Sequence, residues 1–148
     1  MKKEWLIIDR TGFSLVEALL ASAIFVLLVT MLSGAYFYGQ ESAVLAGNTA
    51  RATMFAEEGI EAVRNIRDGG FYDLSDGTYG LAVLGGEWTF SGSEDQADIF
   101  SRQVVISSID VDRKNATVNV SWQQNGQRSG SIALTTEITS WAFPRSVQ

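Results

Sequence analysis

Two short acidic stretches in the C-terminal half place carboxylates at a spacing that could attract a cation. Asp95 follows Glu94 and precedes Asp98 by three residues, while Asp110 and Asp112 flank a single valine. Clustered carboxylate oxygens are ligands that Ca²⁺ prefers, but neither spacing matches the EF-hand loop. These aspartates are therefore weak candidates for a metal site, and we favour solvated acidic loops.

Histidine and cysteine are absent from the 148 residues. Their absence excludes Cys/His zinc sites, Ser-His-Asp and Cys-His nucleophiles, disulfides and haem held by either side chain. A Ser-Lys pair beyond residue 12 would have to use Lys114, which we place in an exposed turn. We therefore expect no enzymatic activity and no cofactor. The net charge of −6 also disfavours nucleic acid as a partner.

Glu17 stands directly before 21 uncharged, mostly apolar residues, 18–38. A run of this length can span the hydrocarbon core of a bilayer, which is about 30 Å thick. A carboxylate at such a boundary costs free energy unless it is hydrated at headgroup depth or paired with a cation. No lysine or arginine lies between Arg10 and Arg51, so a pairing cation would have to come from another subunit.

The residues before Glu17 include three basic and two acidic side chains, all within residues 1–12. This basic excess predicts that the N-terminal end stays in the cytoplasm and that the C-terminal residues lie outside. A cleaved secretory signal peptide is one alternative, although its apolar core is usually only about 7–15 residues long and the small-residue site at 33–35 is weak. A retained signal anchor is another.

The string Gly-Phe-Ser-Leu-Val-Glu at residues 12–17 resembles the signature of type IV prepilins. That signature is a short charged leader ending in glycine, then phenylalanine, then glutamate at the fifth position after the glycine, followed by about twenty apolar residues. In that family a membrane aspartyl peptidase cuts after the glycine and methylates the new N-terminus. The resemblance therefore implies cleavage between Gly12 and Phe13 and methylation of Phe13. Removal of 12 of the 148 residues leaves 136.

The resemblance also supplies a partner for Glu17. In the family this glutamate is thought to pair with the N-terminal amine of a neighbouring subunit, and methylation leaves that amine positive. Such a pair in a low dielectric would set the axial register of an assembly. Other pilin subunits, the prepilin peptidase, and the assembly platform with its ATPase are the further partners implied.

One helix is predicted from Phe13 to about Arg67, because the segment has no proline and a Gly-Gly pair follows it. Residues 13–40 would form a transmembrane or filament-core half. Residues 41–68 would form an amphipathic half packed on a soluble domain. Its apolar positions at roughly helical spacing are Val44, Leu45, Met54, Phe55, Ile60, Val63 and Ile66.

Two glycines interrupt the apolar half of this helix. Many major pilins have a helix-weakening proline where this chain has Gly34, and Gly39 follows five residues later. These glycines either let the helix bend locally or allow neighbouring helices to pack closely, and the sequence favours neither.

Residues 69–148 predict an antiparallel β-sheet, since apolar and polar residues alternate. Strands are expected at 79–84, 87–91, 100–109, 116–123 and 131–139, with hairpin turns at 112–115 and 125–127. The expected fold class is α+β, a long N-terminal α-helix packed on a C-terminal antiparallel β-sheet. This half loosely resembles minor pilins of the PilV kind and the I-type pseudopilins of type II secretion. Many pilins close their C-terminal loop with a disulfide, which this chain cannot form.

The resemblance implies a structural subunit, a minor pilin or pseudopilin, of a type IV pilus or a type II secretion-like filament. Before assembly the protein would lie in the inner (cytoplasmic) membrane as a single-pass protein. Its N-terminus would be inside, and residues 69–148, which we call the head, would be outside. The alternative is a signal-anchored single-pass membrane protein whose extracytoplasmic β-rich head binds a ligand and never polymerises.

Overall fold

The computed structural model describes residues 12, 14–125 and 128–140. The chain divides into two compact units, Met1–Ala43 and Val44–Gln148. A single helix, α1 (Leu15–Gly69), contributes residues to both. The predicted helix end is confirmed to within two residues.

The first unit is helical from Leu15 onward, and every described residue in it is exposed. Its few hydroxyl groups bond back to the helix: Thr30 Oγ1 donates to the Val26 carbonyl at 2.6 Å, and Ser33 Oγ donates to the Val29 carbonyl at 2.8 Å. These bonds satisfy polar groups within an apolar surface. Among the described residues, α1 is the one helix long and apolar enough to cross a membrane.

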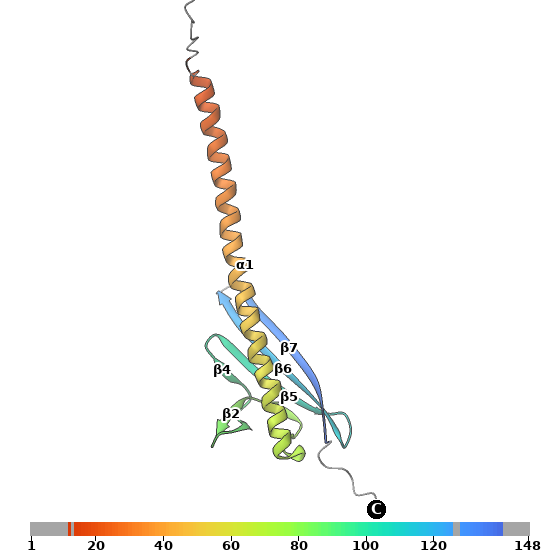
Figure 1. Ribbon diagram of the computed structural model, residues 1–148. Coiled ribbons are helices and arrows are strands. Elements are labelled where there is room, and N and C mark those ends of the chain that lie inside the picture. The colour runs from red at the N-terminus through yellow and green to blue at the C-terminus, as the bar shows by residue number, and fades with distance from the viewer. Residues whose placement is uncertain (1–11, 13, 126–127, 141–148) are drawn as a thin grey trace, which may run out of the picture. The chain divides into compact units, whose positions relative to one another are not determined.

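The described part of the second unit contains seven strands and a short 3₁₀ helix. Its antiparallel sheet confirms the expected α+β class. The main sheet has the order β1-β5-β6-β7, with β4 pairing the other end of β5, and β2 and β3 form a separate hairpin. The later half of α1 lies on one face of the main sheet (Figure 1). The elements are η1 (Phe71–Asp73), β1 (Gly77–Tyr79), β2 (Leu81–Leu84), β3 (Glu87–Phe90), β4 (Asp95–Ala97), β5 (Phe100–Ser108), β6 (Arg113–Asn125) and β7 (Arg128–Thr139).

The helix approaches the sheet closely because small residues line the contact. Ala52, Ala56 and Gly59 are buried there, and a Cβ on Gly59 would lie only 2.9 Å from Val118 Cγ1. Larger side chains complete the core further along the helix and on the sheet. They include Ile60, Val63, Ile66, Phe71, Leu74, Phe100, Val104, Ile106, Val118, Val120 and Trp122.

This contact differs from the predicted apolar face in its first part. Val44, Leu45 and Met54 are exposed, with Met54 70% accessible. The prediction relied on the spacing of large apolar residues. Where the helix lies close to the sheet, however, only small residues such as alanine and glycine fit between them. Ile60, Val63 and Ile66 are buried as expected.

One predicted turn lies in the wrong place. Residues 109–112 connect β5 to β6, and both Ile109 N and Asp110 N donate to the Arg113 carbonyl, at 2.9 and 3.1 Å. Arg113 and Lys114, expected in the turn, are the first residues of β6 and pair with Thr139 and Ile138 of β7. The strands β1 and β4 were not separately predicted, since three residues are too few for a period-two pattern.

The β2–β3 hairpin matches its sequence signal. Gly85 and Gly86 form the turn with φ of 63° and 92°, values that glycine adopts without a steric penalty. Beside the hairpin, the Tyr79 and Phe90 rings stack with centroids 4.5 Å apart, which packs its base against β1.

Candidate functional site

The start of α1 carries the residues singled out for processing and assembly. Ser14 caps the helix, since its Oγ accepts a hydrogen bond from Val16 N at 3.2 Å. Glu17 is exposed in the first turn, where a negative charge interacts favourably with the helix dipole. Gly12 is exposed, with nothing within 4 Å of where its Cβ would stand. Phe13, the expected methylation site, lies outside the described residues.

Ser14 and Glu17 also have the Ser-x-x-Glu spacing of a capping box, in which the glutamate can accept from the N-cap backbone N–H. A complete box would give Glu17 a local role, and among the described residues the serine half of it is formed. A glutamine can serve in a capping box equally well, whereas only a carboxylate forms an ion pair with an amine. The two roles are therefore separable by one substitution.

The apolar run of the first unit presents its side chains outward over its whole length. Leu19, Phe25 and Leu32 are each more than half exposed, as are most of their neighbours. Three aromatic residues end the run at 36–38, and Gln40 Nε2 donates to the Tyr36 hydroxyl at 2.6 Å. Aromatic side chains with polar handles concentrate at membrane–water interfaces. An apolar surface of this extent calls for lipid or protein to cover it.

The helix passes through Gly34 and Gly39 without interruption. Nothing in the described chain lies within 4 Å of a Cβ built on either glycine. Neither of the two sequence interpretations is decided by this geometry, because a packed helix would have to come from another molecule.

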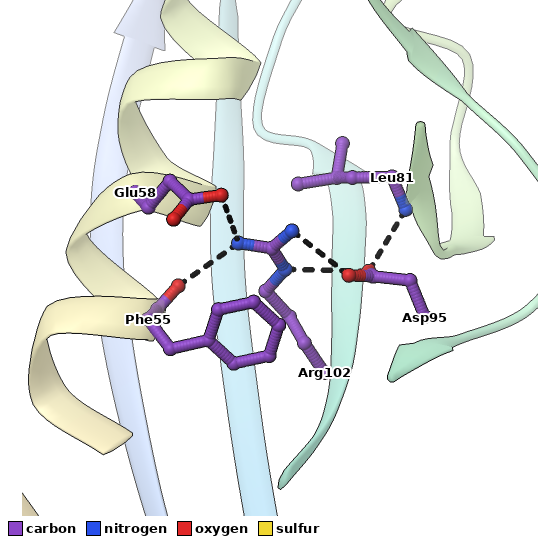
Figure 2. A network of polar contacts seen from close by, with 5 residues as sticks. All are labelled: Phe55, Glu58, Leu81, Asp95 and Arg102. Carbon is purple, nitrogen blue, oxygen red and sulfur yellow. Dashed lines mark hydrogen bonds and ion pairs between the residues drawn. The ribbon is translucent and has the colours of Figure 1, made fainter. Parts of the chain in front are cut away.

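Arg102 on β5 is the main polar feature of the head (Figure 2). Its side chain is 2% exposed and forms a two-point ion pair with Asp95, Nε to Oδ1 at 3.2 Å and Nη2 to Oδ2 at 2.8 Å. Nη1 donates to the Phe55 carbonyl at 3.0 Å and lies 3.5 Å from Glu58 Oε1. The Leu81 N–H donates to Asp95 Oδ1 at 2.9 Å. These five residues join α1, β2, β4 and β5.

This network stabilises a buried charge between the helix and the sheet. A buried charge is tolerated only when it is paired and hydrogen-bonded, and Arg102 also lies 3.9 Å from the centroid of the Phe55 ring.

The sequence analysis missed Arg102, although a signal for it exists. Phe100, Arg102, Val104 and Ile106 alternate along β5, and all four are buried. An arginine at a core position of a period-two pattern predicts a buried ion pair, and the nearby acidic stretch contains its partner.

Two of the weak metal candidates are neutralised by arginines. Asp95 pairs with Arg102, and Asp98 Oδ2 accepts from Arg51 Nη2 at 2.7 Å. The Asp95 pair is mostly buried, whereas both side chains of the Asp98 pair are more than half exposed. Their carboxylates therefore serve separate ion pairs.

The other two candidates stabilise the β5–β6 turn. Asp110 accepts from Arg113 Nε at 2.7 Å and from the Asp112 backbone N–H at 2.9 Å, and these hydrogen bonds lower the pKa of Asp110. Asp112 Oδ1 accepts from Ser140 Oγ at 3.2 Å. Within residues 12, 14–125 and 128–140, no group of three or more acidic side chains is placed to hold a metal ion.

Lys114 was expected in an exposed turn, but it lies on β6 with a side chain only 14% exposed, beside a serine. Its Nζ contacts Ser108 Oγ at 3.1 Å and Asp76 Oδ1 at 3.0 Å, and Ser108 donates to Asp76 from both Oγ and N. Hydrogen bonds from Lys114 and Ser108 lower the pKa of Asp76 to about 2.

No family model, curated protein or solved structure matches this chain.

Proposed function

We propose that this protein is a prepilin-type structural subunit, a minor pilin or pseudopilin, of a type IV pilus or a type II secretion-like filament. The observation that carries the proposal is the order of features at the N-terminus. A Gly12-Phe13 junction is followed by an exposed Glu17 at the start of α1 and by 21 uncharged residues. A simple membrane anchor gives the Gly12-Phe13 junction no role.

Two successive environments would cover the apolar surface of residues 18–38. Lipid covers it while the protein waits in the inner membrane, and the helices of other subunits cover it in a filament. Burial of apolar surface contributes roughly 25 cal/mol per Å², but helices already in lipid gain little from apolar contact alone. Pairing of Glu17 with a neighbour's N-terminal amine would determine how neighbouring helices align with one another.

The geometry of the membrane segment supports a single-pass arrangement. The apolar run spans about 30 Å at 1.5 Å per residue, and the aromatic residues at 36–38 mark its outer end. The basic leader stays in the cytoplasm, where the peptidase, the assembly platform and its ATPase act. The head lies outside the membrane, and neighbouring pilin subunits are its partners in the filament.

Intact mass and N-terminal sequencing of the protein from native membranes test this proposal. The expected chain begins at Phe13 and is one methyl group heavier than its sequence. Replacement of Gly12 by a bulky residue such as leucine should leave the full chain uncut, whereas Thr11→Leu is the matched control and should still be processed. A chain that begins at Met1, or near residue 35, would contradict the proposal.

A signal-anchored protein with a binding head is the second candidate. The observation that favours it is the Ser14 cap, because a capping box gives Glu17 a local role without any partner subunit. That candidate predicts an uncut leader and an N-terminal segment that tolerates Glu17→Gln.

A further inference from the structure

The two edges of the main sheet differ in their protection. On one side, β5 is covered by β1 and β4, which are only three residues each. On the other side, β7 runs for 12 residues, Arg128–Thr139, and no described strand pairs with its outer edge. Natural sheets blunt their edges with short strands, prolines, bulges or lysines. β7 contains neither proline nor lysine, and its one register irregularity lies at its start, opposite Gln123 and Asn125.

An open groove runs beside this unprotected edge. It has a volume of about 720 Å³ and lies between α1 and β7. Met54, Ile60 and Leu134 provide its apolar surface, with Met54 70% exposed. Small, polar side chains on the opposite face of β7 include Ser129 and Ser131. A strand added to β7 would therefore place alternate side chains in the groove and over a flat polar surface.

The charges of the groove indicate the chemistry of the added strand. Glu57, Glu58 and Glu61 line it with a single cation, Arg64, which pairs with Glu61 at 3.2 Å. Glu58 contacts Arg102, whereas Glu57 has no ion pair among the residues that the structure describes. The groove is thus acidic, and so is the whole chain at −6. A basic strand complements it, and a second copy of this acidic chain does not.

We propose that the outer edge of β7 binds a β-strand of a different protein by strand addition, with apolar and basic side chains alternating toward the groove. Backbone hydrogen bonds to β7 provide affinity, and the groove provides specificity for the alternate side chains of the added strand. This inference does not rest on incorporation into a filament, because it uses only residues of the head.

A synthetic peptide tests the proposal on the full chain in a non-ionic detergent. The probe is a nine-residue peptide, Val-Thr-Lys-Thr-Val-Thr-Lys-Thr-Val, blocked at both ends, and a second peptide carries glutamate in place of lysine. Affinity is measured by fluorescence polarisation, and the contact is located by hydrogen–deuterium exchange. We expect saturable binding of the lysine peptide, protection of β7 amides, and roughly tenfold weaker binding when the central valine is replaced by proline.

Charge reversal on the protein gives the matched test. Glu57→Lys should weaken binding of the lysine peptide roughly threefold to tenfold and should strengthen binding of the glutamate peptide. Glu87→Lys is the control, since Glu87 is exposed on β3 away from the groove, and it should leave both affinities nearly unchanged. Binding without β7 protection, equal effects of the two variants, no binding at millimolar peptide, or self-association of the chain through β7 would each overturn the proposal.

Discussion

Arg102 and Asp95 occupy directly paired positions on the antiparallel strands β5 and β4, and their side chains form a two-point ion pair. β4 is only three residues long, so its backbone ladder provides few hydrogen bonds. The ion pair therefore fixes β4 more than its own strand pairing does. Through the Phe55 carbonyl the same arginine holds α1 against the sheet.

Asp95→Asn should lower the free energy of unfolding of the head by about 3–5 kcal/mol, because it leaves the buried guanidinium without its main counter-charge. Urea unfolding of the full chain in detergent measures the loss. Asp98→Asn is the control three residues along, and its exposed pair with Arg51 should contribute at most about 1 kcal/mol. Equal effects of the two substitutions would contradict the structural role of the Arg102 network.

Gly59→Ala should destabilise the head although alanine favours helix formation by about 1 kcal/mol. The new Cβ would lie 2.9 Å from Val118 Cγ1 and 3.1 Å from Arg102 Cδ, and overpacking costs about 1–3 kcal/mol. Gly47→Ala is the matched control in the same helix, where nothing lies within 4 Å. It should stabilise by about 0.5–1 kcal/mol. Denaturant midpoints of the two variants should therefore move in opposite directions.

Stability should depend on pH through Asp76. Its pKa is about 2 in the folded protein against 3.8 for an ordinary aspartate carboxyl, so the unfolded state takes up the proton first as the pH falls. The contribution of Asp76 is complete above about pH 4 and is lost progressively toward pH 2. Denaturant midpoints of the parent protein and Asp76→Asn should differ at pH 7 and converge near pH 2. A gap that stays constant over this range would count against the prediction.

Glu17→Ala and Glu17→Gln together distinguish pairing from capping. If Glu17 pairs with a neighbour's amine, both variants should still be cleaved but should be depleted from filaments, because neither carries a charge. If Glu17 only completes a capping box, the glutamine variant should be incorporated normally. Quantitative mass spectrometry of sheared filaments against the membrane fraction provides the measurement, and Glu17→Asp shows how strictly the reach of the carboxylate matters.

The sequence predicts the long helix and the order of the main strands well, because both depend on periodicity. Val118, Val120 and Trp122 alternate in β6 as their spacing requires, and all three are buried. The turn after β5 was misplaced because Arg113 and Lys114 read as turn residues, whereas their long side chains reach carboxylates from the strand. Local composition cannot reveal the partners that lie far along the chain, which are Glu137 for Arg113 and Asp76 for Lys114.

The candidate sites were predicted less completely than the fold. The acidic stretch with Asp95 and Asp98 was recognised as charged, but its arginine partners lie on β5, 7 residues from Asp95, and on α1, 47 residues from Asp98. The open edge of β7 depends on strand order, which no single segment of sequence specifies. The role of Glu17 stays a prediction, since its argument comes from its place beside an apolar run.

The short strands β1 and β4 limit how many partner strands the main sheet can bind. A sheet that is open at both edges can be extended without limit, as in fibrous aggregates, because each added strand offers a new template. Here one edge ends in three-residue strands, so growth can proceed only from β7. If the strand added there brings a blunted edge of its own, the pairing stops after one partner and yields a defined one-to-one complex.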